Sequence, residues 1–162
     1  MDVSEIHKSG IIRKGEDLIE CKEGYMTRKG NGVLAITNRR FLFLKKPGFF
    51  SKGYHIISEW HLESIASITI TGLISKRLNV QAIVDVGLTN IFQFNIGSSD
   101  ETEIFKEKLI GAKEEFIDEI TVEAEKIIVA QGKKDDSIEI LKKRLARGEI
   151  TLDEFHQKIQ RL

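Results

Sequence analysis

Seven short runs of strand-forming residues, followed by one long helical stretch, restrict the folds open to this chain of 162 residues. Apolar and polar residues alternate most clearly in the last two runs, residues 78–86 and 92–96, which we expect to form a hairpin. Asn79 is predicted on its wet face, opposite the apolar residues Leu78, Val80, Ala82, Val84 and Val86. The earlier runs are Leu18–Tyr25, Val33–Thr37, Phe41–Lys45, Tyr54–Leu62 and Ile65–Thr71. Short runs at this spacing predict an antiparallel barrel or sandwich.

A single helix of about 30 residues is predicted after the strands, because apolar residues recur there every three or four positions. Ser98, Ser99 and Asp100 are its candidate N-caps. At roughly 1.5 Å per residue, such a helix is longer than one small barrel can cover. Its overhanging part therefore needs cover for the apolar side chains of Ile120, Ala124, Ile127 and Ile128.

The C-terminal segment, Ile138 to Leu162, is predicted to form two short helices. Gly148 suits the left-handed residue just past the first helix, and Thr151 with Glu154 forms a capping box for the second. The apolar residues of this pair are Ile138, Leu141, Leu145, Ile150, Leu152, Phe155, Ile159 and Leu162. A unit this small buries too little surface to fold alone, so we expect it to dock on another apolar surface.

The tail sequence LKKRLARGEITLDEFHQKIQRL, residues 141–162, resembles the short C-terminal domain (SHOCT) of bacterial and archaeal proteins. The resemblance implies oligomerisation and, in some members, nucleic-acid binding. We expect a homo-oligomer, and docking within one chain or on another protein stays open. Acidic residues are interleaved with the basic ones in this tail, which makes a nucleic-acid partner unlikely. The expected interface residues are Ile120, Ala124, Ile127, Ile128, Leu141, Leu145, Leu152, Phe155, Ile159 and Leu162.

The segments GEDLIECKEGY (residues 15–25) and GVLAITNRRFLFLKK (residues 32–46) resemble bacterial PH-like and GRAM-type domains. The resemblance implies an α+β fold that is mainly β, a seven-stranded barrel capped by a long C-terminal helix. It also implies binding to lipid head groups or protein segments, with no catalysis and no cofactor. The expected organisation is a PH-like domain at 11–118, a helix extension and linker at 119–136, and a helical hairpin at 137–162.

Basic residues in the predicted loops are the candidates for contact with an anionic lipid or another anion. They are Lys22, Arg28, Lys29, Arg39, Arg40, Lys45, Lys46 and Lys52, with Phe49 and Phe50 beside the last three lysines. Basic and aromatic residues on one loop suit a membrane interface, although both rings could instead plug the barrel. In the Thr37–Arg40 turn, a structural role is favoured for Thr37 and Asn38, and both arginines are predicted to be solvated.

An enzyme is not indicated, because no nucleophile, base and orienting group are recognisable together. His55 and His61 are predicted on one strand face, but surface histidines are the ordinary explanation, and no metal site is expected. Trp60 is predicted to fill the barrel together with Ile56, Ser58 and Leu62.

Composition sets the remaining expectations about partners and location. The 25 basic and 25 acidic residues cancel, so dominant nonspecific attraction to nucleic acid or anionic membrane is not expected. With one cysteine and no apolar stretch long enough to span a bilayer, the protein is expected in the cytoplasm, with peripheral contact at the inner membrane surface left open.

Overall fold

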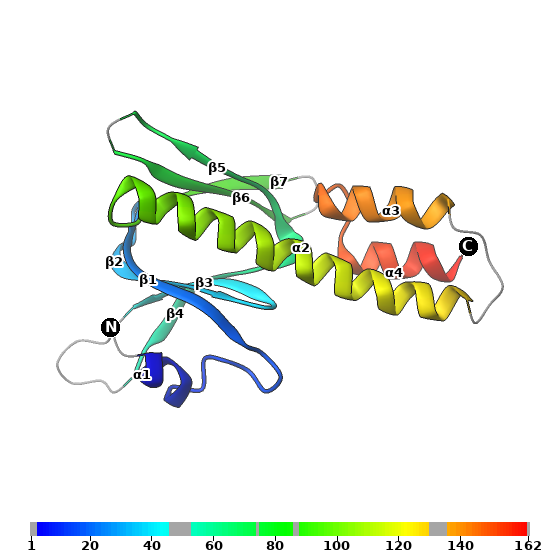
Figure 1. Cartoon of the computed structure of the whole chain (residues 1–162), viewed down its shortest axis with the longest axis horizontal. Coiled ribbons are helices and arrows are strands. Elements are labelled where there is room, and N and C mark those ends of the chain that lie inside the picture. Colours follow the sequence, from blue (N-terminus) through cyan, green and yellow to red (C-terminus); the bar gives the residue numbers. More distant parts are fainter. Residues whose placement is uncertain (1–2, 46–52, 74, 86–87, 130–135, 162) are drawn as a thin grey trace.

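The computed structural model describes residues 3–45, 53–73, 75–85, 88–129 and 136–161, with the backbone alone for residues 3, 123–129, 136 and 160. Seven strands form one antiparallel sheet in the order β4-β3-β2-β1-β7-β6-β5, and three longer helices follow it (Figure 1). The elements are α1 (Val3–Lys8), β1 (Leu18–Met26), β2 (Gly30–Thr37), β3 (Arg40–Lys45), β4 (His55–His61), the 3-10 turn η1 (Leu62–Ser64), β5 (Ile65–Thr71), β6 (Arg77–Asp85), β7 (Leu88–Asn95), α2 (Ser99–Val129), α3 (Asp136–Ala146) and α4 (Leu152–Gln160). The predicted strand number and long helix are confirmed.

The sheet bends at the end of β1, where this strand passes from one half of the barrel to the other. It pairs with β2 over most of its length, but with β7 only through Tyr25 and Met26. Gly24 lies at this corner, and a Cβ atom there would come within 2.8 Å of the Asn95 carbonyl oxygen. Glycine therefore permits the close approach of β1 and β7 that closes the barrel.

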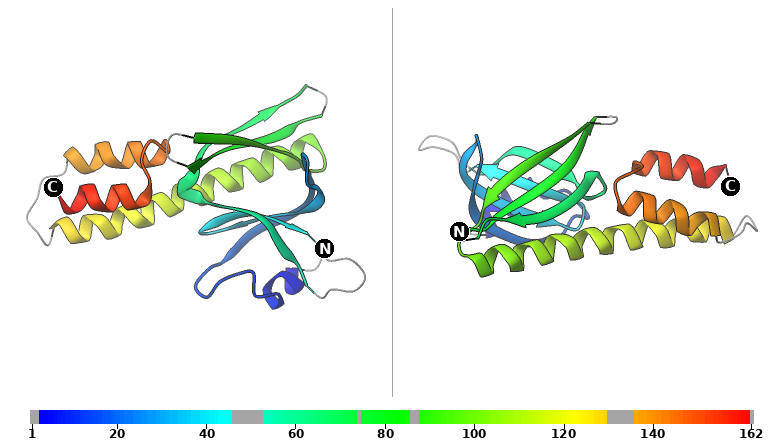
Figure 2. Two further views of the ribbon diagram at one scale, coloured as in Figure 1. Left: turned by 180° about the vertical axis from the view of Figure 1, so that it is seen from behind. Right: turned by 90° about the horizontal axis from the view of Figure 1, so that it is seen from above.

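Helix α2 runs along one side of the barrel and continues past it, so that barrel and tail lie on the same side of α2 (Figure 2). Aromatic rings fill the barrel beneath this helix, with Phe41 lying 5.3 Å from both Trp60 and Phe94 between ring centroids. Phe105 of α2 lies 6.2 Å from Phe41, which joins the helix to the same core. The prediction that Trp60 fills the barrel is confirmed.

A second apolar cluster lies on the outer face of β2 and β3. Ile6 of α1, Ile11 and Tyr54 pack there against the buried Val33, Ala35, Leu42 and Leu44. Both faces of these two strands are therefore covered. The sequence interpretation did not include this cluster or the N-terminal helix that helps to form it.

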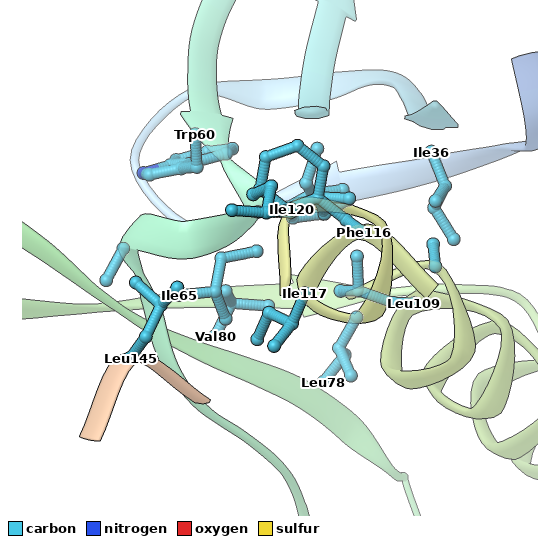
Figure 3. Packing of buried hydrophobic residues seen from close by; sticks show 14 of the residues in the cluster. Ile36, Trp60, Ile65, Leu78, Val80, Leu109, Phe116, Ile117, Ile120 and Leu145 are labelled. Atoms are coloured by element: carbon cyan, nitrogen blue, oxygen red, sulfur yellow. The ribbon is translucent and has the colours of Figure 1, made fainter. Parts of the chain in front are cut away.

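The tail hairpin docks on its own chain. Leu145 and Phe155 have no exposed surface, and both belong to the cluster that contains Ile65 and Ile117 (Figure 3). Lys113 of α2 joins the two parts, because its ammonium group donates to the carbonyl oxygens of Ile65 in the barrel and Ala146 in the tail. In the single chain, the tail therefore takes the route within one chain, and the preferred expectation of docking between copies stays a prediction.

The turn between α3 and α4 has the local chemistry that the sequence predicts. The Thr151 side chain accepts from the Glu154 N–H, and the Glu154 carboxylate accepts from the Thr151 N–H, so the capping box is present. Gly148 has a φ of 67°, the left-handed conformation expected after α3. Its Cα faces β5, where an added Cβ would lie 3.2 Å from the Ala66 Cα.

The burial expected for three strand residues is wrong. Asn79 is only 7% exposed, whereas Val84 on the predicted apolar face is 49% exposed. Ile56 is exposed as well, because a bulge in the pairing of β3 with β4 falls at Ile57 and shifts the alternation. The same bulge removes the basis for placing His55 and His61 on one face, and both are exposed.

Candidate ligand-binding surfaces

Arg40 is not a solvated anion ligand, in contrast to the prediction, because it is 1% exposed and lies in a buried ionic network. Its guanidinium donates to Glu16 through Nε at 2.8 Å and Nη2 at 2.6 Å, which is a bidentate pair. It also donates to Glu59 at 2.6 Å and to the Ile11 carbonyl oxygen at 3.0 Å. Thr37 donates to Glu16 at 2.6 Å. The guanidinium of Arg40 is therefore bonded to groups of its own chain and is not available to an outside anion.

The pKa of Glu16 reflects this network. Burial favours the neutral acid and would raise the pKa, but bonds from Arg40, Thr37 and the Arg13 backbone N–H outweigh it and lower the pKa to about 2. Glu16 is therefore ionised at neutral pH. It ties the N-terminal segment before β1 to the turn between β2 and β3.

Thr37 and Asn38 have the structural roles predicted for them. The Thr37 hydroxyl accepts from the Arg40 N–H at 2.8 Å, and the Asn38 side chain accepts from the Asp17 N–H at 2.9 Å. Both bonds hold the turn against the segment that carries Glu16. The side chains of Thr37 and Asn38 therefore serve the turn itself.

Lys22 and Arg39 are also engaged by carboxylates on α2. Lys22 lies 2.9 Å from Glu101, and Arg39 lies 3.0 Å from Glu119, each as the distance from nitrogen to oxygen. The Arg39 guanidinium also lies over the Phe116 ring, 5.3 Å from its centroid. These two cations position α2 on the barrel.

Three predicted cations remain together at the end of the β1–β2 hairpin, and we call Arg28, Lys29 and Lys45 the basic end. All three are exposed, and none of them forms an ion pair with a described residue. The Lys45 ammonium donates to the Lys29 carbonyl oxygen at 3.2 Å, so β3 and the hairpin turn are in contact. Arg28 has a φ of 70°, the one left-handed non-glycine residue in the described part of the chain.

Two hollows flank the basic end. One, of about 450 Å³, lies between Arg28 and Lys29 on one side and Asn90 to Gln93 of β7 on the other. A second, of about 600 Å³, is lined by Lys45, Tyr54, Tyr25 and Glu23, among others. Glu23 is the acidic residue in these linings, so the surface is basic in balance. The predicted residues Lys46, Phe49, Phe50 and Lys52 follow Lys45 directly in the chain and lie outside the described residues.

The predicted oligomerisation residues are buried within the chain wherever their side chains are described. Ile120, Leu141, Leu145, Phe155 and Ile159 are buried, and Leu152 is partly buried against the same cluster. The side chains of Ala124, Ile127, Ile128 and Leu162 lie outside the described part of the structure.

A hollow of about 440 Å³ lies at the junction of barrel and tail and was not foreseen from the sequence. It is lined by residues of the buried network and by Arg13, Lys14, Arg39, His61, Phe116 and Leu152. These residues come from five separate segments, so no local pattern signals the site.

The described residues offer no group of three or more His, Cys, Asp or Glu side chains placed to hold a metal ion. Over the same residues, every helix is too short or too polar to cross a membrane.

The comparisons with known proteins agree with this architecture. Residues 136–162 match the family model for the short C-terminal domain, SHOCT. The fold is similar to the linker-DH/PH domains of p115-RhoGEF, with a TM-score of 0.52, 10% identity, and coverage of 64% of this chain and 30% of that chain. It is also similar to PDZ-RhoGEF DH/PH domains in complex with RhoA, with a TM-score of 0.51, 10% identity, and coverage of 71% and 34%. The search of curated proteins found no match.

The matched region spans about a third of these DH/PH structures, and at 10% identity the likeness concerns the fold alone. Within that limit, the seven-stranded barrel capped by α2 has a PH-like fold. A SHOCT hairpin follows it in the same chain. The PH-like fold and the SHOCT resemblance expected from the sequence are therefore confirmed.

Proposed function

We propose that this protein is a non-catalytic binding module that attaches to anionic membrane surfaces through the basic end of its PH-like barrel. One observation carries the proposal. Lys22, Arg39 and Arg40 are each paired with carboxylates, whereas Arg28, Lys29 and Lys45 gather at one end without a carboxylate partner among the described residues. The charges of the basic end are therefore available to an anion outside the protein.

The backbone of Arg28 supports this role. A left-handed conformation costs a residue with a side chain about 1–2 kcal/mol relative to the right-handed one, and such strain tends to occur at functional positions. The turn is held by the Lys29 N–H, which donates to the Met26 carbonyl oxygen at 3.0 Å. Arg28 is thereby fixed at the tip of the hairpin.

The expected affinity is modest. A basic residue near an anionic membrane contributes about 1 kcal/mol, so the basic end supplies roughly 3 kcal/mol. The sequence places Lys46, Phe49, Phe50 and Lys52 next to Lys45, and these residues would add charge and apolar contact. Binding is therefore expected to be reversible and to weaken as salt is added.

Co-sedimentation with vesicles of phosphatidylglycerol and phosphatidylcholine tests the proposal. The double variant Arg28→Gln/Lys29→Gln removes two charges from the basic end, and about 2 kcal/mol corresponds to a loss of roughly 30-fold in vesicle binding. The control Lys158→Gln/Arg161→Gln removes two charges from α4, at the other end of the long axis (Figure 1). We expect it to bind like the wild type within about twofold.

Two further variants sharpen the test. Glu23→Gln removes the acidic residue beside the basic end, so vesicle binding should rise by roughly fivefold, equivalent to about 1 kcal/mol. Phe49→Ser/Phe50→Ser tests the apolar contribution of these two rings, and its vesicle binding should be weaker than that of the wild type. Equal binding by the Arg28/Lys29 variant and its control, or no sedimentation of the wild type with anionic vesicles, would rule out the membrane function.

A further inference from the structure

Strand β5 is a free edge of the sheet. Its strand neighbour is β6, and the sheet order ends at β5. Within the described residues, no backbone hydrogen bond joins Ser67–Thr71 to any segment other than β6. About half of the backbone N–H and C=O groups of Ser67–Thr71 therefore point outward without a backbone partner in the described part of the chain.

The two edges of the sheet differ in how they are protected. The other edge strand, β4, carries Glu59 and two histidines, contains the bulge at Ile57, and is bonded through Glu59 to Arg13 and Arg40. Charges and bulges of this kind keep an edge from pairing with another strand. In contrast, the sequence from Ile65 to Ser75 contains no charged residue and no proline.

Strand β5 is also held in place before any partner arrives. Ile68 and Ile70 pack against the barrel core, and Ser67 donates to Gln81 at 3.1 Å on the outer face. Thr71 accepts from Asn79 at 2.9 Å on that same face. A partner strand would meet an edge that is already extended, so little conformational entropy is lost on pairing.

The tail limits how much of the edge is free. Gly148 packs on Ala66, and Lys113 donates to the Ile65 carbonyl oxygen, so the first two residues of β5 are covered. The open part is Ser67–Thr71, followed by the fully exposed Leu73. Any partner must therefore align with these five residues.

We propose that β5 pairs antiparallel with β5 of a second copy of this chain, which joins the two sheets across a two-fold axis. Of the two edge strands that the chain offers, β5 is the uncharged one, so a second β5 is the edge that fits it. Side chains alternate between the two faces of a strand, so residues that pair across such an axis come from the same face of β5 in each copy. Ser67, Thr69 and Thr71 then meet serine or threonine, and Ile68 and Ile70 meet isoleucine, which are favourable cross-strand pairs.

Five residues per strand form a small interface, so the dimer is expected to depend on concentration. Sedimentation velocity of the full chain from micromolar to millimolar concentration measures how the mass in solution changes with concentration. The wild-type mass should rise from one chain toward two, and Thr69→Lys should stay at one, because lysine at an edge opposes pairing. Thr89→Lys is the matched control, an equally charged substitution at an exposed position of the interior strand β7, and should behave like the wild type.

A cross-linking experiment identifies the strand directly. Ser67→Cys, Thr69→Cys and Thr71→Cys are each oxidised with glutathione disulfide, and the variant nearest the two-fold axis should form a disulfide-linked dimer. Cys21 does not interfere, because it is buried and burial raises the pKa of its thiol. A wild type that stays at one chain, a rise in mass that Thr69→Lys leaves unchanged, or a dimer in which none of the three cysteines cross-links would overturn the proposal.

Discussion

Replacing Glu16 by glutamine is expected to lower the free energy of unfolding by about 3 kcal/mol at pH 7. An unperturbed glutamate has a pKa of 4.5, and the network lowers the pKa of Glu16 to about 2. At about 1.4 kcal/mol per pH unit, the folded protein prefers the ionised carboxyl over the neutral one by roughly 3 kcal/mol. Glutamine is nearly isosteric with the neutral carboxyl, so the substitution should cost about this amount.

The pH dependence separates this mechanism from a simple packing defect. Because the pKa is lower in the folded state, the stabilisation is complete above pH 4.5 and is lost as the pH falls toward 2. At pH 3, roughly 2 of the 3 kcal/mol should be gone. The difference between wild type and Glu16→Gln should therefore shrink to about 1 kcal/mol at pH 3.

Urea denaturation at pH 7 and at pH 3, followed by Trp60 fluorescence, measures this difference, since Trp60 is the single tryptophan and is buried. Other carboxylates whose pKa is lowered, such as Glu103 bonded to Lys76, occur in both proteins and cancel. Glu23→Gln, at an exposed position, is the control and should change stability by less than about 0.5 kcal/mol. An equal difference at the two pH values, or one below about 1 kcal/mol at pH 7, would refute the reasoning.

Three other predictions concern the tail and the helix that carries it. Gly148→Ala should destabilise by about 1–2 kcal/mol in denaturant titration, because the residue is left-handed and faces Ala66. A Cβ added at Gly111 in α2 would meet no atom within 4 Å, so Gly111→Ala should instead stabilise the protein by about 0.5–1 kcal/mol. If both substitutions changed the free energy of unfolding in the same direction, the docked arrangement would be contradicted. Lys113→Met removes the bonds that join barrel and tail, so limited proteolysis should cut the tail faster than in the wild type, and unchanged cleavage would count against this role. Thr151→Ala should lower stability by about 1 kcal/mol through loss of the capping box, and a thermal melt that coincides with the wild type would argue against it.

Local signals in the sequence were sufficient for the strand pattern, the long helix and the tail. The Gly148 turn and the Thr151 capping box depend on neighbouring residues, so their chemistry is readable from a few positions. The Thr37 and Asn38 turn was predictable for the same reason. These features need no knowledge of distant contacts.

Features that depend on distant contacts were missed. Arg40 is buried because Glu16 and Glu59, far from it in sequence, neutralise it, and no pattern around residue 40 shows this. The outer cluster on β2 and β3 did have a signal. The unbroken apolar runs Val33–Ile36 and Phe41–Leu44 favour a strand that is covered on both faces.

Docking of the tail within the chain was one of three arrangements that the sequence left open, beside docking on another copy or on another protein. A short polar linker permits each of these arrangements. The apolar stripes of the tail require an apolar surface as partner, but they do not show whether that surface belongs to the same chain or to another molecule. The choice depends on the shape of the barrel end around Ile65 and Ala66, which pairing within the sheet creates.

Because α2 is a single helix shared by barrel and tail, it behaves as a rigid spacer of 31 residues, or about 46 Å. A reporter attached after α4 would move with the barrel as one body instead of drifting on a tether. Energy-transfer measurements between a dye there and a labelled vesicle would therefore report the tilt of the whole molecule on the bilayer.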